Sequence, residues 1–153
     1  MELNRDNPQP NDQLISSAGT ITGGGVLTVT NLGTPLQPGD HFQLFNESVN
    51  GFLTVNLPSL GAGEAWQNNV GVDGSIRVVS TTAGSLGYQA GAGQIELSWP
   101  ADHVGWRLLV QTNELANGLG TNWVGVTNAS TTNQISFPIN PANGSVFFRL
   151  VYP

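Results

Sequence analysis

The sequence predicts an all-β protein with a β-sandwich or jelly-roll-like fold, and three observations support this prediction. Apolar and polar residues alternate in short runs of about four to eight residues, the spacing of half-buried strands. Turn-forming residues separate these runs, as in Pro38-Gly39-Asp40, Asp73-Gly74 and Asn143-Gly144. No stretch keeps the period of an amphipathic helix over three turns.

The predicted strands follow from this alternation and from the turns that bound it. In the first half they are Val26–Thr30, His41–Asn46, Phe52–Leu57 and Ser75–Ser80. Gly23-Gly24-Gly25 precedes the first of them; because it leads into a strand and not a helix, we interpret it as a turn or bulge and not as a phosphate-binding loop. In the second half the predicted strands are Gly87–Ala90, Gln94–Trp99, Trp106–Thr112, Asn122–Thr127, Asn133–Ile139 and Val146–Tyr152.

A stretch of small residues, STTAGSLGYQAGAG at 80–93, divides the chain into two blocks. Residues 1–80 are rich in Gly and Thr, whereas residues 85–153 hold three of the four tryptophans. A chain of 153 residues is long enough to bury one core without disulfides or metals. We therefore expect a single compact module over 1–153, built from both blocks, with short β-solenoid character as an option for the first.

Charge and cysteine content exclude several classes of function. The net charge is −6, lysine is absent, and the cations are Arg5, Arg77, Arg107 and Arg149. Nucleic acid and anionic membranes need clustered Lys and Arg, so neither is an expected partner. No apolar run approaches about 18 residues, so we expect no membrane insertion. The absence of cysteine excludes disulfides, thiolate metal sites and cysteine nucleophiles.

The chain begins with MELNRDNPQPND, which has neither the basic nor the apolar region of a signal peptide. Either a signal was removed or the chain is a piece of a longer one, and we favour the second. The many Gly, Asn, Thr and Ser residues, with few charges, are typical of secreted bacterial repeat proteins. We therefore expect an extracellular or cell-surface location within a parent multidomain protein.

Residues Leu14–Val79 contain SAGTITGGGVLTVTNLGTPLQPGDHFQLFN, then LPSLGAGEAW, then VDGSIRVV. This order of motifs resembles the autotransporter-associated β-strand segment of large secreted bacterial surface proteins. The second block, with LSW, WRLLVQT and FFRL, resembles a C-terminal β-sandwich module often joined to such segments, and is distantly similar to half of a fibronectin type III domain. The resemblance implies an architecture and carries no catalytic motif. Because little sequence precedes the motif, we expect the strands of the first block to join the second block in one sandwich.

The sequence predicts no enzyme, no cofactor and no metal site, although a structural calcium ion is left open. Most carboxylates stand beside turn residues, where they cap turns and solvate loops. Each of the two histidines directly follows an aspartate, in Asp40-His41 and Asp102-His103, and a metal-dependent enzyme built on these two pairs is the least favoured alternative. A metal needs three or four convergent ligands, and the two pairs lie far apart in the sequence.

The alternation of apolar and polar residues divides the aromatic residues into those expected in the core and those expected at the exposed surface. Trp99, Trp106 and Phe137 share faces with aliphatic residues and are predicted to lie in the core. Trp123 is out of phase with Val124 and Val126, and Trp66 belongs to no clear strand, so both are predicted to be exposed. Tyr88 stands among glycines and could face either way.

Flat aromatic rings beside amides suit the apolar face and the hydroxyl groups of a sugar ring. The predicted ligand-binding residues are therefore Trp66, Trp123, Tyr88, Asn68 and Asn122. The ligand would be a neutral polysaccharide of the cellulose, xylan, chitin or mannan type. The leading hypothesis is a non-catalytic carbohydrate-binding module; the alternative is a structural stalk or terminal cap of a surface adhesin with no ligand of its own.

Overall fold

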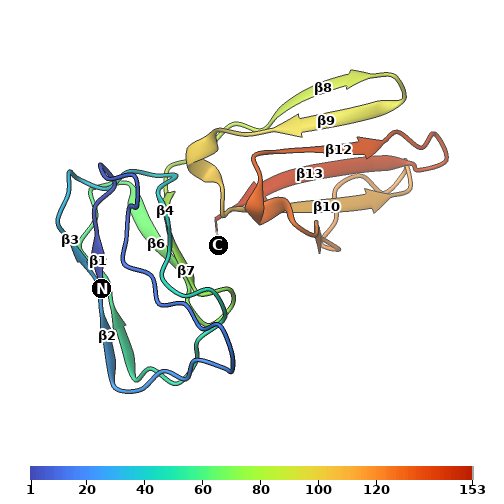
Figure 1. The fold of residues 1–153 in the computed structure, drawn as a ribbon. Helices are drawn as coiled ribbons and strands as arrows, with labels where there is room; N and C mark the ends of the chain where they lie inside the picture. Colours follow the sequence, from blue (N-terminus) through green and yellow to red (C-terminus); the bar gives the residue numbers. More distant parts are fainter. Residues whose placement is uncertain (153) are drawn as a thin grey trace. The chain divides into compact units, whose positions relative to one another are not determined.

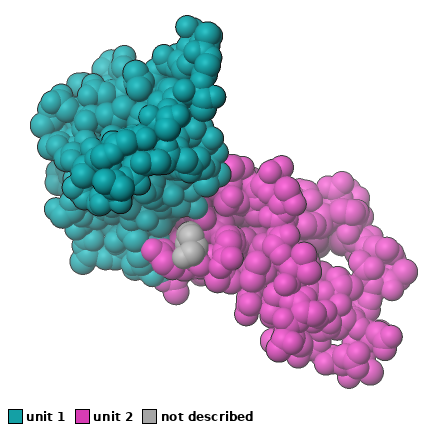
Figure 2. Space-filling view, turned by 90° about the horizontal axis from the view of Figure 1, so that it is seen from below, with its two compact units in different colours: residues 1–82 teal, residues 83–153 magenta. Residues whose placement is uncertain are grey.

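The computed structural model describes residues 1–152 and is all-β, which confirms the predicted fold class. The chain divides into two compact units, Met1–Thr82 and Ala83–Pro153, coloured separately in Figure 2. The division falls inside the stretch of small residues at 80–93. No sheet formed by residues 1–152 combines strands of both blocks. The strands of the first block therefore do not join the second block in one sandwich, contrary to expectation, and each unit has its own core.

Unit 1 begins as a short parallel β-solenoid (Figure 1). Its parallel strands are β1 (Glu2–Leu3), β2 (Val26–Thr28), β3 (Thr30–Asn31) and β5 (Thr54–Asn56), paired as β1-β3 and β2-β5. Glu2 lies beside Thr30 and Val26 beside Thr54, so in both pairs the partner stands 28 positions further along (2 to 30 and 26 to 54). We call residues 1–28 the first rung and residues 29–57 the second. The solenoid character expected as an option for this block is present.

An antiparallel sheet follows the second rung. Its strands are β4 (His41–Gln43), β6 (Glu64–Asn69) and β7 (Ser75–Ser80), in the order β4-β7-β6. On one side, β4 and the residue after it face the first rung, since the Leu14 N–H donates to the Leu44 carbonyl (2.9 Å) and Asn11 Nδ2 to the Gln43 carbonyl (2.8 Å). On its other side β4 pairs with β7. β7 therefore takes the place of a third rung but runs in the opposite direction.

The core of unit 1 lies inside the rungs and against the antiparallel sheet. Leucines and valines of the rungs meet the inward residues of β4 and β7. The buried apolar residues that pack together in this cluster are Leu3, Leu27, Val29, Leu36, Phe42, Leu44, Phe45, Val49, Val70, Ile76 and Val78. Asn46 Nδ2 donates to the Ser16 carbonyl (2.9 Å), and its Oδ1 accepts from the Ser16 N–H (3.1 Å). A side-chain amide thus replaces backbone pairing where the two rungs turn.

Unit 2 consists of two three-stranded antiparallel sheets. One contains β12 (Gln134–Pro138), β9 (Gln94–Ser98) and β8 (Gly87–Gly91), and the other β11 (Val124–Gly125), β10 (Arg107–Asn113) and β13 (Ser145–Val151), each in that order. Two 3-10 turns, Ala101–His103 and Ala129–Thr131, complete it. The core contains Leu97, Trp99 and Leu108, with partly buried Phe137 and Phe148 packed against it and their ring centroids 5.0 Å apart. The buried positions of Trp99 and Trp106 are as predicted.

No helix in residues 1–152 combines the length and apolar character needed to cross a membrane.

Candidate functional site

The main candidate site is an open hollow in unit 2 of about 500 Å³, lined largely by apolar side chains. Its lining residues come from β8 and the residue before it, from β9 and β13, and from the segment before β11. They are Leu86, Tyr88, Ile95, Leu97, Leu119, Trp123, Val146, Phe147, Phe148 and Arg149. Tyr88 and Trp123, both predicted ligand residues, therefore meet at one hollow. Tyr88 is 71% exposed, so its ring is available to a bound molecule.

Trp123 is less open than the sequence predicts. The residue is half-buried, and the Arg149 guanidinium carbon lies 4.2 Å from the centre of its ring. This is the geometry of a cation–π contact, and it covers one face of the indole. No carboxylate of residues 1–152 forms an ion pair with Arg149. The hollow therefore carries one positive charge that no acidic side chain neutralises.

A closed network of side-chain amides holds the segment that carries Trp123. Gln111, on β10, is 1% exposed; its Nε2 donates to Asn122 Oδ1 (2.7 Å), and its Oε1 accepts from Asn113 Nδ2 (3.0 Å) and from the Gly120 N–H (2.8 Å). Asn122 Nδ2 donates in turn to Asn113 Oδ1 (3.0 Å). Both ends of the Asn122 amide are thus hydrogen-bonded within the protein, so this predicted ligand residue helps to hold the loop. Sequence reasoning missed Gln111, because alternation assigns it to the solvent side of its strand.

The other two predicted ligand residues, Trp66 and Asn68, lie in unit 1 on β6. Trp66 is half-buried; its Nε1 donates to the Pro58 carbonyl (2.7 Å), and its ring centroid is 6.4 Å from that of Phe42. It packs against the core cluster, so the prediction of an exposed indole outside any strand is wrong. Asn68 is exposed, but its Oδ1 accepts from the Val70 N–H (3.1 Å) and closes a turn.

The two Asp–His pairs serve separate local roles. In unit 1, Asp40 accepts from the Gln37 N–H (2.8 Å) and pairs with Arg5 Nε (3.1 Å). His41 as a whole residue is exposed, but its ring is partly buried, and this burial lowers its pKa. The Arg77 guanidinium lowers the pKa of His41 further, and the Asp73 carboxylate raises it. In unit 2, Asp102 Oδ1 lies 2.6 Å from Nδ1 of the buried His103, whose ring is 4.7 Å from that of Trp106.

In the part of the chain that the structure describes, no three His, Asp or Glu side chains come together as a group able to hold a metal ion.

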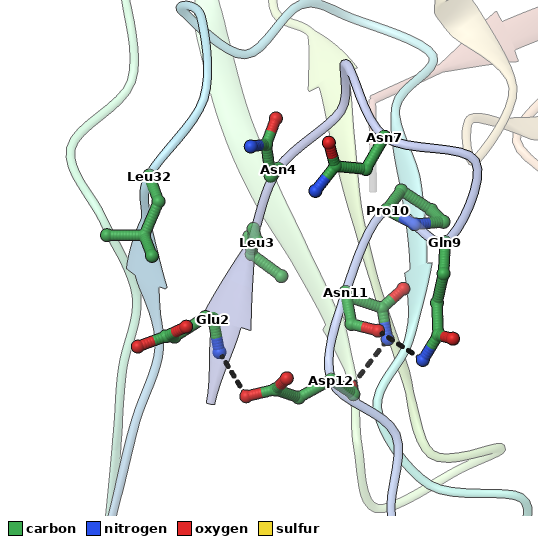
Figure 3. Close-up of a pocket in the computed structure, with 9 residues that line it drawn as sticks. All are labelled: Glu2, Leu3, Asn4, Asn7, Gln9, Pro10, Asn11, Asp12 and Leu32. Carbon is green, nitrogen blue, oxygen red and sulfur yellow. Dashed lines mark hydrogen bonds between the residues drawn. The ribbon is translucent and has the colours of Figure 1, made fainter.

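Each unit also carries a further hollow. A polar one of about 200 Å³ lies between β1 and the loop that folds back on it (Figure 3). Its amides are partly engaged: Asn11 Nδ2 donates to the Asp12 carbonyl (2.6 Å), and Asp12 Oδ2 accepts from the Glu2 N–H (3.0 Å). The second, of about 710 Å³ in unit 2, is lined by Val110, Phe137, Ile139, Pro141 and other mostly apolar residues.

Comparisons of the chain with protein-family models, with curated proteins and with solved structures found no match.

Proposed function

We propose that this chain is a non-catalytic structural module that ends a β-solenoid in an exported surface protein. One observation carries the proposal: β7 pairs with the edge of β4 on which a third rung would stack, but it runs antiparallel. Parallel stacking therefore stops at this edge, as repeat proteins require of their terminal units. The motifs of residues 14–79, which resemble the autotransporter-associated segment, accord with this role.

The turn before β7 holds this strand against β4. Gly74 has φ +81°, a conformation that favours glycine, and a Cβ added there would collide with the carbonyl oxygens of Phe45 and Glu47. Its own carbonyl accepts from the N–H groups of Leu44 and Phe45 (3.1 Å each). A larger residue at this position should force β7 away from β4 and expose the edge of the second rung.

The proposal is tested by the association state of the full chain. We expect the wild type to sediment as a monomer over a wide concentration range, and Gly74→Val to self-associate, because an uncovered strand edge pairs with other chains. Gly24→Val is the matched control, since nothing lies within 4 Å of a Cβ at Gly24. A destabilised Gly74→Val that remains monomeric would contradict the capping role.

Polysaccharide binding is the second candidate, favoured by the exposed Tyr88 and by Trp123 in one hollow. Trp66 belongs to the other unit and packs against its core, so support for a surface shared by Trp66 and Trp123 is lost. Retention on insoluble cellulose, xylan, chitin and mannan separates the two functions. Retention of the wild type that Tyr88→Ala abolishes would favour the binding module; passage of both proteins through all four matrices favours the structural one.

A further inference from the structure

Among residues 1–152, no strand pairs with one edge of β13. It is the last strand of its sheet and pairs only with β10, from Arg107–Val151 to Asn113–Ser145. Within residues 1–152 no other backbone hydrogen bond reaches Ser145–Val151. The outward-pointing N–H and C=O groups of a seven-residue strand are therefore free to pair with another strand.

The apolar hollow of unit 2 adjoins this free edge. Consecutive residues of a strand point to opposite faces of a sheet, yet Val146, Phe147, Phe148 and Arg149 all line the hollow. Side chains of both faces can border the same space only where that space lies at the edge of the strand. Across it stand side chains of the other sheet and the segment before it, namely Leu86, Tyr88, Ile95 and Leu97.

The arrangement of strands shows what would fill the space. Immunoglobulin-type sandwiches contain a sheet in which strands C, F and G lie together. Unit 2 also consists of two sheets, and its first strand is β8. When the strands β8 to β13 are matched in chain order to strands A to F, β10 corresponds to strand C and β13 to strand F. By this correspondence the unpaired edge of β13 is the edge at which strand G pairs in such sandwiches, so the space beside it suits a strand.

The positive charge of Arg149 favours one kind of strand as the partner of β13. Arg149 stands on β13 and lines the hollow, and no carboxylate of the described residues pairs with it. A second copy of this chain that paired through its own β13 would bring the sequence SVFFRLV, which contains an arginine and no carboxylate to place against Arg149. A strand of a different polypeptide that brings a carboxylate to Arg149 fits the edge better.

We propose that β13 receives an extended peptide strand from another polypeptide. The strand pairs with the free edge through backbone hydrogen bonds, places alternate apolar side chains in the hollow, and sets an acidic side chain against Arg149. Strand addition of this kind takes its affinity from the backbone and its specificity from the pockets for alternate side chains. The inference rests on unit 2 alone and does not depend on the capping role of unit 1.

The test uses the full chain and a synthetic nine-residue peptide of alternating valine and threonine with glutamate at its centre. Calorimetry measures binding, and NMR follows amide exchange. We expect the peptide to slow exchange within Ser145–Val151 and to leave Gln134–Pro138, an edge strand of the other sheet, unchanged. Absence of binding, or equal protection of both strands, would overturn the proposal.

Three controls identify the contacts. A peptide with proline at three alternate positions should not bind, because proline cannot donate to a strand ladder. Central lysine in place of glutamate, and Arg149→Ala with the original peptide, should each weaken binding roughly two- to five-fold, as exposed ion pairs do. Equal affinity of the proline peptide would refute backbone pairing. A concentration-dependent dimer of the free protein that protects Ser145–Val151 would make a second copy the occupant and refute the proposal.

Discussion

Replacing Gln111 with leucine tests whether the buried amide network holds the loop that carries Trp123. Leucine has a similar volume, so the change removes three hydrogen bonds, to Asn113, Asn122 and Gly120, without opening a large cavity. A net contribution of about 1 kcal/mol for each bond gives about 3 kcal/mol. Because Asn122 and Gly120 are exposed and regain water, we expect a loss of about 2 kcal/mol.

For a domain the size of unit 2, this loss corresponds to a fall of about 8–16 °C in its melting temperature. Calorimetry of the full chain measures the fall, and faster exchange of the Gly120 amide should accompany it. Gln134→Leu is the matched control, since Gln134 is an exposed glutamine on β12 and surface changes stay within about 0.5 kcal/mol. If the two variants melt alike, the network does not stabilise unit 2 and the reasoning is wrong.

Three further predictions concern single side chains. Trp99→Ala should destabilise unit 2 by about 3–5 kcal/mol, the usual cost of emptying a buried aromatic site; an unchanged melt would disprove the burial of this ring. Trp66→Phe should cost unit 1 about 1 kcal/mol through the lost bond to the Pro58 carbonyl, whereas an exposed tryptophan would leave the melt unchanged. Burial lowers the pKa of His41 below 6.5, so the unfolded chain binds more protons and stability falls as the pH drops below this value. His41→Gln should lose less stability between about pH 7 and pH 5 than the wild type, and parallel pH curves of the two proteins would exclude this contribution.

Alternation along single strands predicted the interior of unit 2 well, because one face of β9 and one face of β10 meet in the core. The same rule failed for Gln111. This residue does lie on the face opposite Leu108, but residues that follow in the chain, among them Gly120 and Asn122, cover that face. A covering loop is a tertiary feature that no pattern within the strand reveals.

β6 and the rungs were harder to predict for different reasons. The sequence of β6, EAWQNN, has no apolar alternation, and the strand forms because β7 beside it supplies the buried side chains. The rungs pair residues 28 positions apart (2 to 30 and 26 to 54), and a single repeat of that spacing gives no visible period. The candidate site was predictable only in part, since Tyr88 and Trp123 meet there whereas Trp66 and Asn122 have structural roles.

The two rungs of unit 1 also determine how far the unit can lengthen when it is pulled. Neighbouring strands are separated by about 4.8 Å, so the second rung adds little to the length of the folded unit. Detaching the 28 positions of one rung would release roughly 90–100 Å of extended chain, at about 3.3–3.6 Å per residue. A pulling force that detaches one rung therefore replaces about 4.8 Å of folded length by roughly 90–100 Å of extended chain, an increase of roughly twenty-fold. Under load, the unit would lengthen by unfolding a rung before the extended chain is strained.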